Sequence, residues 1–179
     1  MAGSAPLPLR TFAAQKQVRV VVTGDTHLGV RRRGPLPAAL LAACDGADHI
    51  LHTGDVVDAG LLDELAGLAS LDGVAGNCDG WDVSARVPAE QTVEIGGLRV
   101  GLVHDPGPVR DRRARLRARF PDARVVCFGH THLPVCDDRD GLLLLNPGSP
   151  TERRRSPWHS YAELAIGPGD AVQATIVRL

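Results

Sequence analysis

Six times along the chain, an apolar run with the character of a β-strand ends in a short cluster of Asp, Asn, His and Gly residues. The runs and the clusters that follow them are 18–23 with Gly24-Asp25-Thr26-His27, 49–53 with Gly54-Asp55, 74–75 with Gly76-Asn77-Cys78-Asp79, 98–103 with His104-Asp105, 124–128 with Gly129-His130-Thr131-His132, and 142–145 with Asn146-Pro147-Gly148-Ser149. In open α/β sheets, ligands collect in the crevice outside the carboxyl ends of the strands. We therefore expect these clusters to meet in one cleft, although they are far apart in the sequence.

Between the first three runs lie two stretches with the character of helices. Residues 35–43 begin with two prolines and continue with good helix formers, and residues 58–70 place leucines at helical spacing. Alternation of strands and helices is typical of βαβ units, whose strands are parallel and whose crossovers are right-handed. The first half of the chain therefore predicts a parallel sheet.

The second half of the chain has a different pattern. Residues 91–103 and 160–179 each contain two strand-like runs joined by a Gly-rich turn, which predicts two antiparallel hairpins. Residues 109–120 predict a helix with six arginines, which we interpret as a solvated face rather than a phosphate or nucleic-acid patch. Together the two halves predict an α/β fold in which two mixed β-sheets pack as a sandwich flanked by helices.

Length and composition limit the possible organisation. With 179 residues, 44% of them hydrophobic, the chain suffices for one domain with a sizeable core, which we place at residues 18–179 after a disordered leader at 1–17. A formal net charge of −1 disfavours nucleic acid as a partner, and no apolar run reaches the ~20 residues of a membrane-spanning helix. The amino terminus lacks the order of a signal peptide, and the four cysteines share no CxxC spacing, so we expect a cytoplasmic protein.

The clusters contain residues that bind transition metals. Asp25 with His27, and His130 with His132, place two coordinating groups two residues apart, so both side chains of a pair can point to one side of an extended segment. Carboxylate and imidazole ligands favour Mn²⁺, Fe²⁺, Zn²⁺ or Ni²⁺ over Ca²⁺ and Mg²⁺. Asp55 can bind one metal ion through each carboxylate oxygen and hold two ions roughly 3.5–4 Å apart. Asn77 offers an amide oxygen and His104 offers a further imidazole, and these complete the set of candidate ligands.

In this order, the motifs Gly-Asp-Thr-His, Gly-Asp, Gly-Asn-Cys-Asp, a strand-end His, Gly-His-Thr-His and Asn-Pro-Gly-Ser resemble those of the calcineurin-like metallophosphoesterases. More narrowly, residues 18–179 resemble the small bacterial and archaeal phosphodiesterases of this superfamily, which are relatives of the small retromer subunit. The resemblance implies two divalent transition-metal ions, for which we expect Mn²⁺ ahead of Fe, Zn or Ni. One ion would be held by Asp25, His27, Asp55 and His132, and the other by Asp55, Asn77, His104 and His130.

The resemblance predicts a phosphodiesterase in which a hydroxide that bridges the two metal ions attacks the phosphorus of a small phosphate diester. Among the ligands, Asp55, Asn77 and His104 would take part directly in catalysis. Cys78 stands where many members of the superfamily have a His that protonates the leaving alcohol, and the sequence leaves open whether the thiol has this role or is a small packed residue. The alternative functions are a phosphomonoesterase or nucleotidase with the same metals, and a non-catalytic interaction scaffold of the same fold.

Taken singly, each cluster is also explained by a turn, a helix cap or a buried histidine, and it is the set of six at strand ends that favours a metal site. We further expect Asp79 to orient a metal-binding histidine and the arginines at 31–33 to reach a substrate phosphate. The segment 146–149 is either only a turn or a support for the cleft. The natural substrate and the oligomeric state, including a homo-oligomer, stay open. Three histidines belong to no cluster and are expected to be structural or surface residues: His49, His52 and His159.

Overall fold

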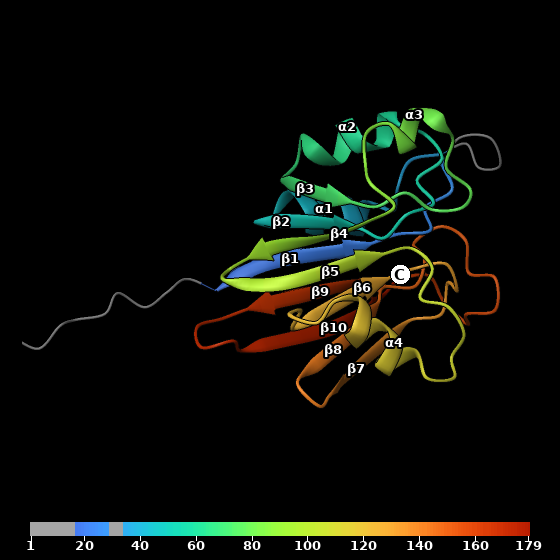
Figure 1. Ribbon diagram of the computed structural model, residues 1–179. Coiled ribbons are helices and arrows are strands. Elements are labelled where there is room, and N and C mark those ends of the chain that lie inside the picture. Colours follow the sequence, from blue (N-terminus) through green and yellow to red (C-terminus); the bar gives the residue numbers. More distant parts are fainter. Residues whose placement is uncertain (1–16, 29–33) are drawn as a thin grey trace, which may run out of the picture.

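Five of the six apolar runs form strands in the computed structural model, which describes residues 17–28 and 34–179 (Figure 1). In chain order the elements are β1 (Val18–Thr23), α1 (Ala38–Asp45), β2 (His49–His52), α2 (Gly60–Ala66), β3 (Ser70–Gly73), α3 (Trp81–Ser84), β4 (Glu90–Ile95), β5 (Leu98–Val103), α4 (Arg112–Arg119), β6 (Val125–Phe128), β7 (Val135–Arg139), β8 (Leu142–Asn146), β9 (Ser160–Ile166) and β10 (Val172–Arg178). The expected leader, apart from Gln17, and the arginines at 31–33 lie outside the described residues.

The strands form two mixed sheets of five strands each. The first sheet has the order β10-β9-β1-β2-β3, and the second has the order β4-β5-β6-β8-β7. β1, β2 and β3 are mutually parallel, as are β5, β6 and β8, whereas β9, β4 and β7 run antiparallel to the strands beside them. Both expected hairpins are present, and Gly96 and Gly97 between β4 and β5 have φ values of 60° and 84°, as a two-residue turn of this kind requires.

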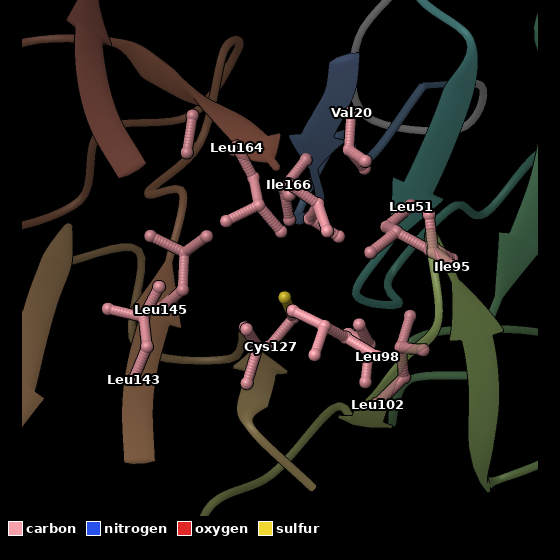
Figure 2. Close-up of a cluster of buried hydrophobic side chains, with 14 of the residues drawn as sticks. Val20, Leu51, Ile95, Leu98, Leu102, Cys127, Leu143, Leu145, Leu164 and Ile166 are labelled. Atoms are coloured by element: carbon pink, nitrogen blue, oxygen red, sulfur yellow. The ribbon is translucent and has the colours of Figure 1, made fainter. Parts of the chain in front are cut away.

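The two sheets pack face to face through an apolar cluster. Figure 2 shows Leu51 and Leu164 of the first sheet on one side of this cluster, with Cys127 and Leu145 of the second sheet on the other. Burying an aliphatic side chain of this size contributes roughly 1.5–3 kcal/mol. The interlayer cluster therefore holds the two sheets together and fixes the relative position of their strand ends.

Helices cover the outer faces of both sheets (Figure 1). Leu40 of α1, Leu65 of α2 and Val83 of α3 pack with Ile50 on the first sheet, and Leu116 of α4 packs on the second. No helix in the described part of the chain has the length and apolar character needed to cross a membrane.

The arginines of α4 do not form the solvated face expected from the sequence. Arg113 donates three hydrogen bonds of 2.6–2.8 Å to backbone carbonyls of the β7–β8 hairpin. Arg117 donates to the carbonyl of Asp140 in the same hairpin, and Arg115 donates to the carbonyl of Pro106 after β5. These side chains hold the helix to its neighbours. Arg110, which precedes the helix, is almost fully exposed.

Two expected boundaries are wrong, and two elements were not expected. The helix expected at 58–70 ends at Ala66, because the chain from Ser70 onward joins the first sheet as β3. The run at 74–75 follows β3 instead of forming a strand, and the N–H of Ala75 donates to the carbonyl of Pro88. β7 and α3 were missed; β7 contains two aspartates and an arginine, which are typical of loops as well as of edge strands.

Candidate metal centre

The polar clusters meet where strands of the two sheets end, around the carboxylate of Asp55. Its Oδ2 atom lies 3.4 Å from Nε2 of His27, which follows β1 of the first sheet. Its Oδ1 atom lies 3.4 Å from Nε2 of His104, which follows β5 of the second sheet. Asp55 therefore lies between two groups of candidate ligands, which we call the buried half and the open half.

The buried half consists of Asp25, His27 and His132. Nε2 of His132 lies 3.5 Å from Oδ1 of Asp25 and 3.3 Å from Nε2 of His27. The exposed fractions of these residues are 0%, 6% and 0%. One oxygen and two imidazole nitrogens this close together can bind one metal ion.

The open half consists of Asn77, His104 and His130. The Oδ1 atom of Asn77 lies 3.0 Å from Nε2 of His104 and 2.8 Å from Nδ1 of His130. His104 is buried, but His130 is half-buried and Asn77 is exposed. With Asp55, these atoms can bind a second metal ion on the side that solvent reaches.

Two buried carboxylate oxygens provide a test of whether the residues fit a metal. Oδ2 of Asp25 and Oδ2 of Asp55 have no hydrogen-bond partner within the described residues. Burial, reinforced by the charge of Asp55, raises the pKa of Asp25 to about 8. Burial acts in the same direction on Asp55, but the N–H of Cys78 and the nearby His104 and His27 outweigh it and lower the pKa. A divalent cation would satisfy both oxygens, so the donor set fits a metal.

Backbone carbonyls determine which nitrogen of two histidines faces the centre. Nδ1 of His104 donates to the carbonyl of Thr53 at 2.8 Å, and Nδ1 of His132 donates to the carbonyl of Glu152. With the proton on Nδ1, Nε2 keeps the lone pair that a metal needs. Burial lowers the pKa of His132 to about 4 and also lowers the pKa of His27, so these imidazoles stay neutral.

The candidate ligands have unusual backbone angles. Residues other than glycine seldom have a positive φ, and each such residue costs on the order of 1–3 kcal/mol. Half of the ten such residues in the described part of the chain are candidate ligands, with φ between 45° and 68°. They are Asp25, His27, Asp55, His130 and His132. Backbone strain is therefore concentrated at the centre.

Asp79 holds the strained loop that carries Asp55. Its carboxylate accepts hydrogen bonds from the N–H groups of Asp55, Val57 and Gly76 at 3.0, 2.7 and 2.7 Å. Val57 is β-branched and has a φ of 73°, a conformation that such residues rarely adopt. The hydrogen bonds of Asp79 thus go to this backbone, in place of the expected contact with a metal-binding histidine.

Two glycines allow the strand ends to approach the centre. A Cβ atom at Gly54, which has a φ of 96°, would lie 2.7 Å from Nδ1 of His104. A Cβ atom at Gly76 would overlap Oδ1 and the N–H of Asp55. Any larger residue at either position would displace a candidate ligand.

The segment after β8 supports the centre, which is one of the two roles that the sequence left open for it. Nδ2 of Asn146 donates to the carbonyl of Gly129 at 3.0 Å, and Oγ of Ser149 donates to the carbonyl of Asp25 at 2.8 Å. These hydrogen bonds connect the segment to the loops after β6 and β1. The segment therefore fixes candidate ligands from both sheets.

His52 contacts the centre indirectly, which the sequence reasoning missed. The N–H of Gly54 donates to its Nδ1 at 3.2 Å, and its Nε2 lies 3.2 Å from the hydroxyl of Thr26. That hydroxyl also lies 3.3 Å from the carbonyl of Asp55. Burial lowers the pKa of His52 to about 3, which keeps the ring neutral. Its place in the strand run before Gly54 was the available signal.

Cys78 lies beside Asp55 at the open half. Its N–H donates to Oδ1 of Asp55 at 2.8 Å, and its Sγ accepts from Nδ2 of Asn77 at 3.4 Å. The residue is exposed, and its sulfur is within 4.8 Å of ligand atoms of His27 and Asp55. The thiol is therefore accessible from solvent and close to the metal-binding atoms.

Two charged residues near the centre were missed because they belong to a loop and not to a strand end. Oε2 of Glu152 lies 3.6 Å from Nε2 of His27. Nη1 of Arg154 donates to the carbonyl of His130 at 3.4 Å. These side chains place one negative and one positive charge beside the candidate ligands.

The chain is similar to known proteins in sequence and in fold. Residues 18–167 match the family model of the calcineurin-like phosphoesterase superfamily domain. A probable metallophosphoesterase of Methanocaldococcus jannaschii is 36% identical over 161 residues, which cover 88% of this chain and 80% of that protein. The solution structure of a Thermotoga maritima protein is similar with a TM-score of 0.70 at 30% identity, over 90% of this chain and 99% of that chain. Vps29 of Entamoeba histolytica has a TM-score of 0.71 at 24% identity, over 90% and 99%, which shows the fold alone.

The family match includes every candidate ligand from Asp25 to His132 and all strands except β10. The resemblance inferred from the ordered motifs is therefore confirmed, and so is the sandwich of two mixed sheets. The family model and the archaeal relative agree that this chain belongs to the calcineurin-like phosphoesterase superfamily.

Proposed function

We propose that the chain is a cytoplasmic phosphodiesterase that hydrolyses a small phosphate diester with two divalent metal ions, Mn²⁺ before Fe, Zn or Ni. The observation that carries the two-metal proposal is Asp55, whose two carboxylate oxygens each face a histidine at 3.4 Å. In this proposal Asp55 would be a ligand of both ions. The other ligands are Asp25, His27 and His132 for one ion and Asn77, His104 and His130 for the other.

When bound, two such ions polarise phosphoryl oxygens and lower the pKa of water, so that a nucleophile forms at neutral pH. The protein supplies position and solvent exclusion. The Nδ1–H groups of His104 and His132 donate hydrogen bonds to backbone carbonyls, which leaves Nε2 of each ring directed at the centre. In this proposal the substrate reaches Asp55, Asn77 and His104 from the open half. We assign to the Cys78 thiol the transfer of a proton to the leaving alcohol, because it is exposed there.

The space beside the open half supports a diester over a monoester. A hollow of about 340 Å³ beside the open half, lined in part by Asn77, His104 and Arg119, gives room for a second ester arm.

The test is to strip the purified protein of metal, add Mn²⁺ stepwise, and compare hydrolysis of bis(4-nitrophenyl) phosphate with hydrolysis of 4-nitrophenyl phosphate. We expect metal-dependent cleavage with the diester well ahead of the monoester. The metal-free protein and an Asp55→Ala variant serve as controls. Faster cleavage of the monoester would replace the proposal with a phosphomonoesterase or nucleotidase. No turnover with any transition metal, despite two bound ions, would favour an interaction scaffold.

A further inference from the structure

A charged loop is fastened to the candidate metal centre at its first residues. The hydroxyl of Thr151 donates to the carbonyl of Thr26 at 2.6 Å. The carbonyl of Glu152 accepts the Nδ1 proton of His132. These two hydrogen bonds fix the start of the loop to the backbone of one candidate-ligand segment and to the side chain of a candidate ligand. The side chains that follow are therefore kept close to the centre.

Arg154 is the cation that this loop places at the centre. Its Nη1 donates to the carbonyl of His130 at 3.4 Å, and its Nε lies 4.0 Å from Oε1 of Glu152. Its backbone has a φ of 48°, a conformation that costs free energy for a residue other than glycine. The guanidinium has five N–H donors, and the side chain is 38% exposed, so donors remain for an anion that enters from solvent.

The positive charge of Arg154 lies beside the candidate ligands, because its Nη1 donates to the carbonyl of His130. The neighbouring Arg153 differs, because its Nη1 donates to the carbonyl of Pro157 at 3.0 Å within the loop. Arg154 thus differs from Arg153 in that it contacts a candidate-ligand segment.

We infer that Arg154 binds a non-bridging oxygen of the substrate's phosphoryl group and that Glu152 holds the guanidinium in position. This inference deepens the proposed function and rests on it. Guanidinium N–H groups match phosphate oxygens in both charge and geometry. A hydrogen bond to a charged group of this kind corresponds to about a ten- to hundredfold change in affinity.

The experiment compares Arg154→Asn with wild type and with Arg155→Asn, a matched change at the exposed neighbouring arginine. Asn removes the charge and tolerates the left-handed backbone. Calorimetry measures binding of inorganic phosphate to the Mn²⁺-loaded chain, elemental analysis measures bound metal, and steady-state kinetics on bis(4-nitrophenyl) phosphate give kcat and KM. For Arg154→Asn we expect phosphate affinity to fall about ten- to hundredfold, KM to rise more than kcat falls, and metal content to stay unchanged. Arg154→Lys should recover part of the affinity, and Arg155→Asn should match wild type.

Phosphate affinity within about twofold of wild type in a metal-loaded Arg154→Asn chain would overturn the inference. Where that variant does not fold, Arg154→Gly, which relieves the left-handed strain, is judged by the same criterion. If wild type binds phosphate but cleaves no ester, the proposed function fails. A loss of phosphate binding in Arg154→Asn would then still support the phosphate-binding role inferred for Arg154. If wild type cleaves the diester and Arg154→Asn does so with unchanged kcat/KM, the inference fails alone.

Discussion

The two halves of the candidate metal centre use similar ligands but differ in their exposure to solvent. Asp25 and His132 in the buried half are fully buried, whereas Asn77 in the open half is exposed and His130 is half-buried. Removal of ligands from water strengthens their attraction to a cation and slows exchange. We therefore expect the buried half to retain its ion and the open half to be the side that meets substrate.

The largest effect is expected at Asp55, which both halves share. Asp55→Ala should lower kcat/KM for the diester by at least about a thousandfold, because two ions lose a ligand and their fixed spacing. Elemental analysis should show reduced metal at both positions. Asp82→Ala, an exposed carboxylate in α3, is the matched control. Retained activity in Asp55→Ala would contradict the bridging role.

A comparison of His132→Ala with His130→Ala separates the halves directly. His132→Ala should remove the tightly held ion and nearly all activity, because a fully buried ligand is lost. His130→Ala should weaken binding of the second ion by about ten- to a hundredfold and leave the first ion in place. Metal content after gel filtration in metal-free buffer measures both outcomes. Equal losses in the two variants would show that the halves do not differ.

Metal removal tests the same difference without mutation. A weak chelator should take one ion from the open half before the second leaves, with affinities at least about tenfold apart. Binding to the folded state should raise the free energy of unfolding by about 2.7 kcal/mol at a metal concentration a hundred times the Kd. Calorimetric titration and thermal unfolding at each metal ratio are the measurements. Release of both ions in a single step would argue against two distinct halves.

The smallest effect on an activated substrate is expected at Cys78. A nitrophenolate leaves without a proton, so Cys78→Ala should change kcat for bis(4-nitrophenyl) phosphate by less than about threefold. With a diester of two simple alcohols, the same variant should lose at least about tenfold. Cys136→Ala, an exposed cysteine in β7, is the control. Equal effects on both diesters would show that Cys78 does not protonate the leaving alcohol.

The strand ends and the meeting of the polar clusters in one place were predictable because their signals are local, whereas the division of the ligands into two sets came from the family resemblance. An apolar run followed at once by glycine and a polar cluster defines a strand end in only a few residues, as in Val18–Thr23 before Gly24. The parallel order of β1, β2 and β3 also follows from alternation along the chain. These features need no knowledge of distant contacts.

Other features depend on contacts that no local pattern contains. β7 carries Asp137 and Asp138, whose partners are arginines of α4 and of the segment before β6, so its sequence alone resembles a loop. Asp79 acts on the backbone of a loop more than twenty residues earlier, as its hydrogen bonds to Asp55 and Val57 show. Arg154 contacts the carbonyl of His130, which precedes it by 24 residues, so its place beside the centre depends on the fold and not on a local pattern.

The pairing of β1 with β9 has a consequence for synthesis on the ribosome. β1 lies between β2 and β9, and Val18 at its start is opposite Ile166 in β9, which is far away in the sequence. One edge of β1 therefore has no partner until β9 has been synthesised. Unpaired strand edges favour association with other chains, and distant pairings slow folding. The nascent protein thus carries β1 with one unpaired edge until β9 emerges, and in this interval a chaperone would lower the risk of association.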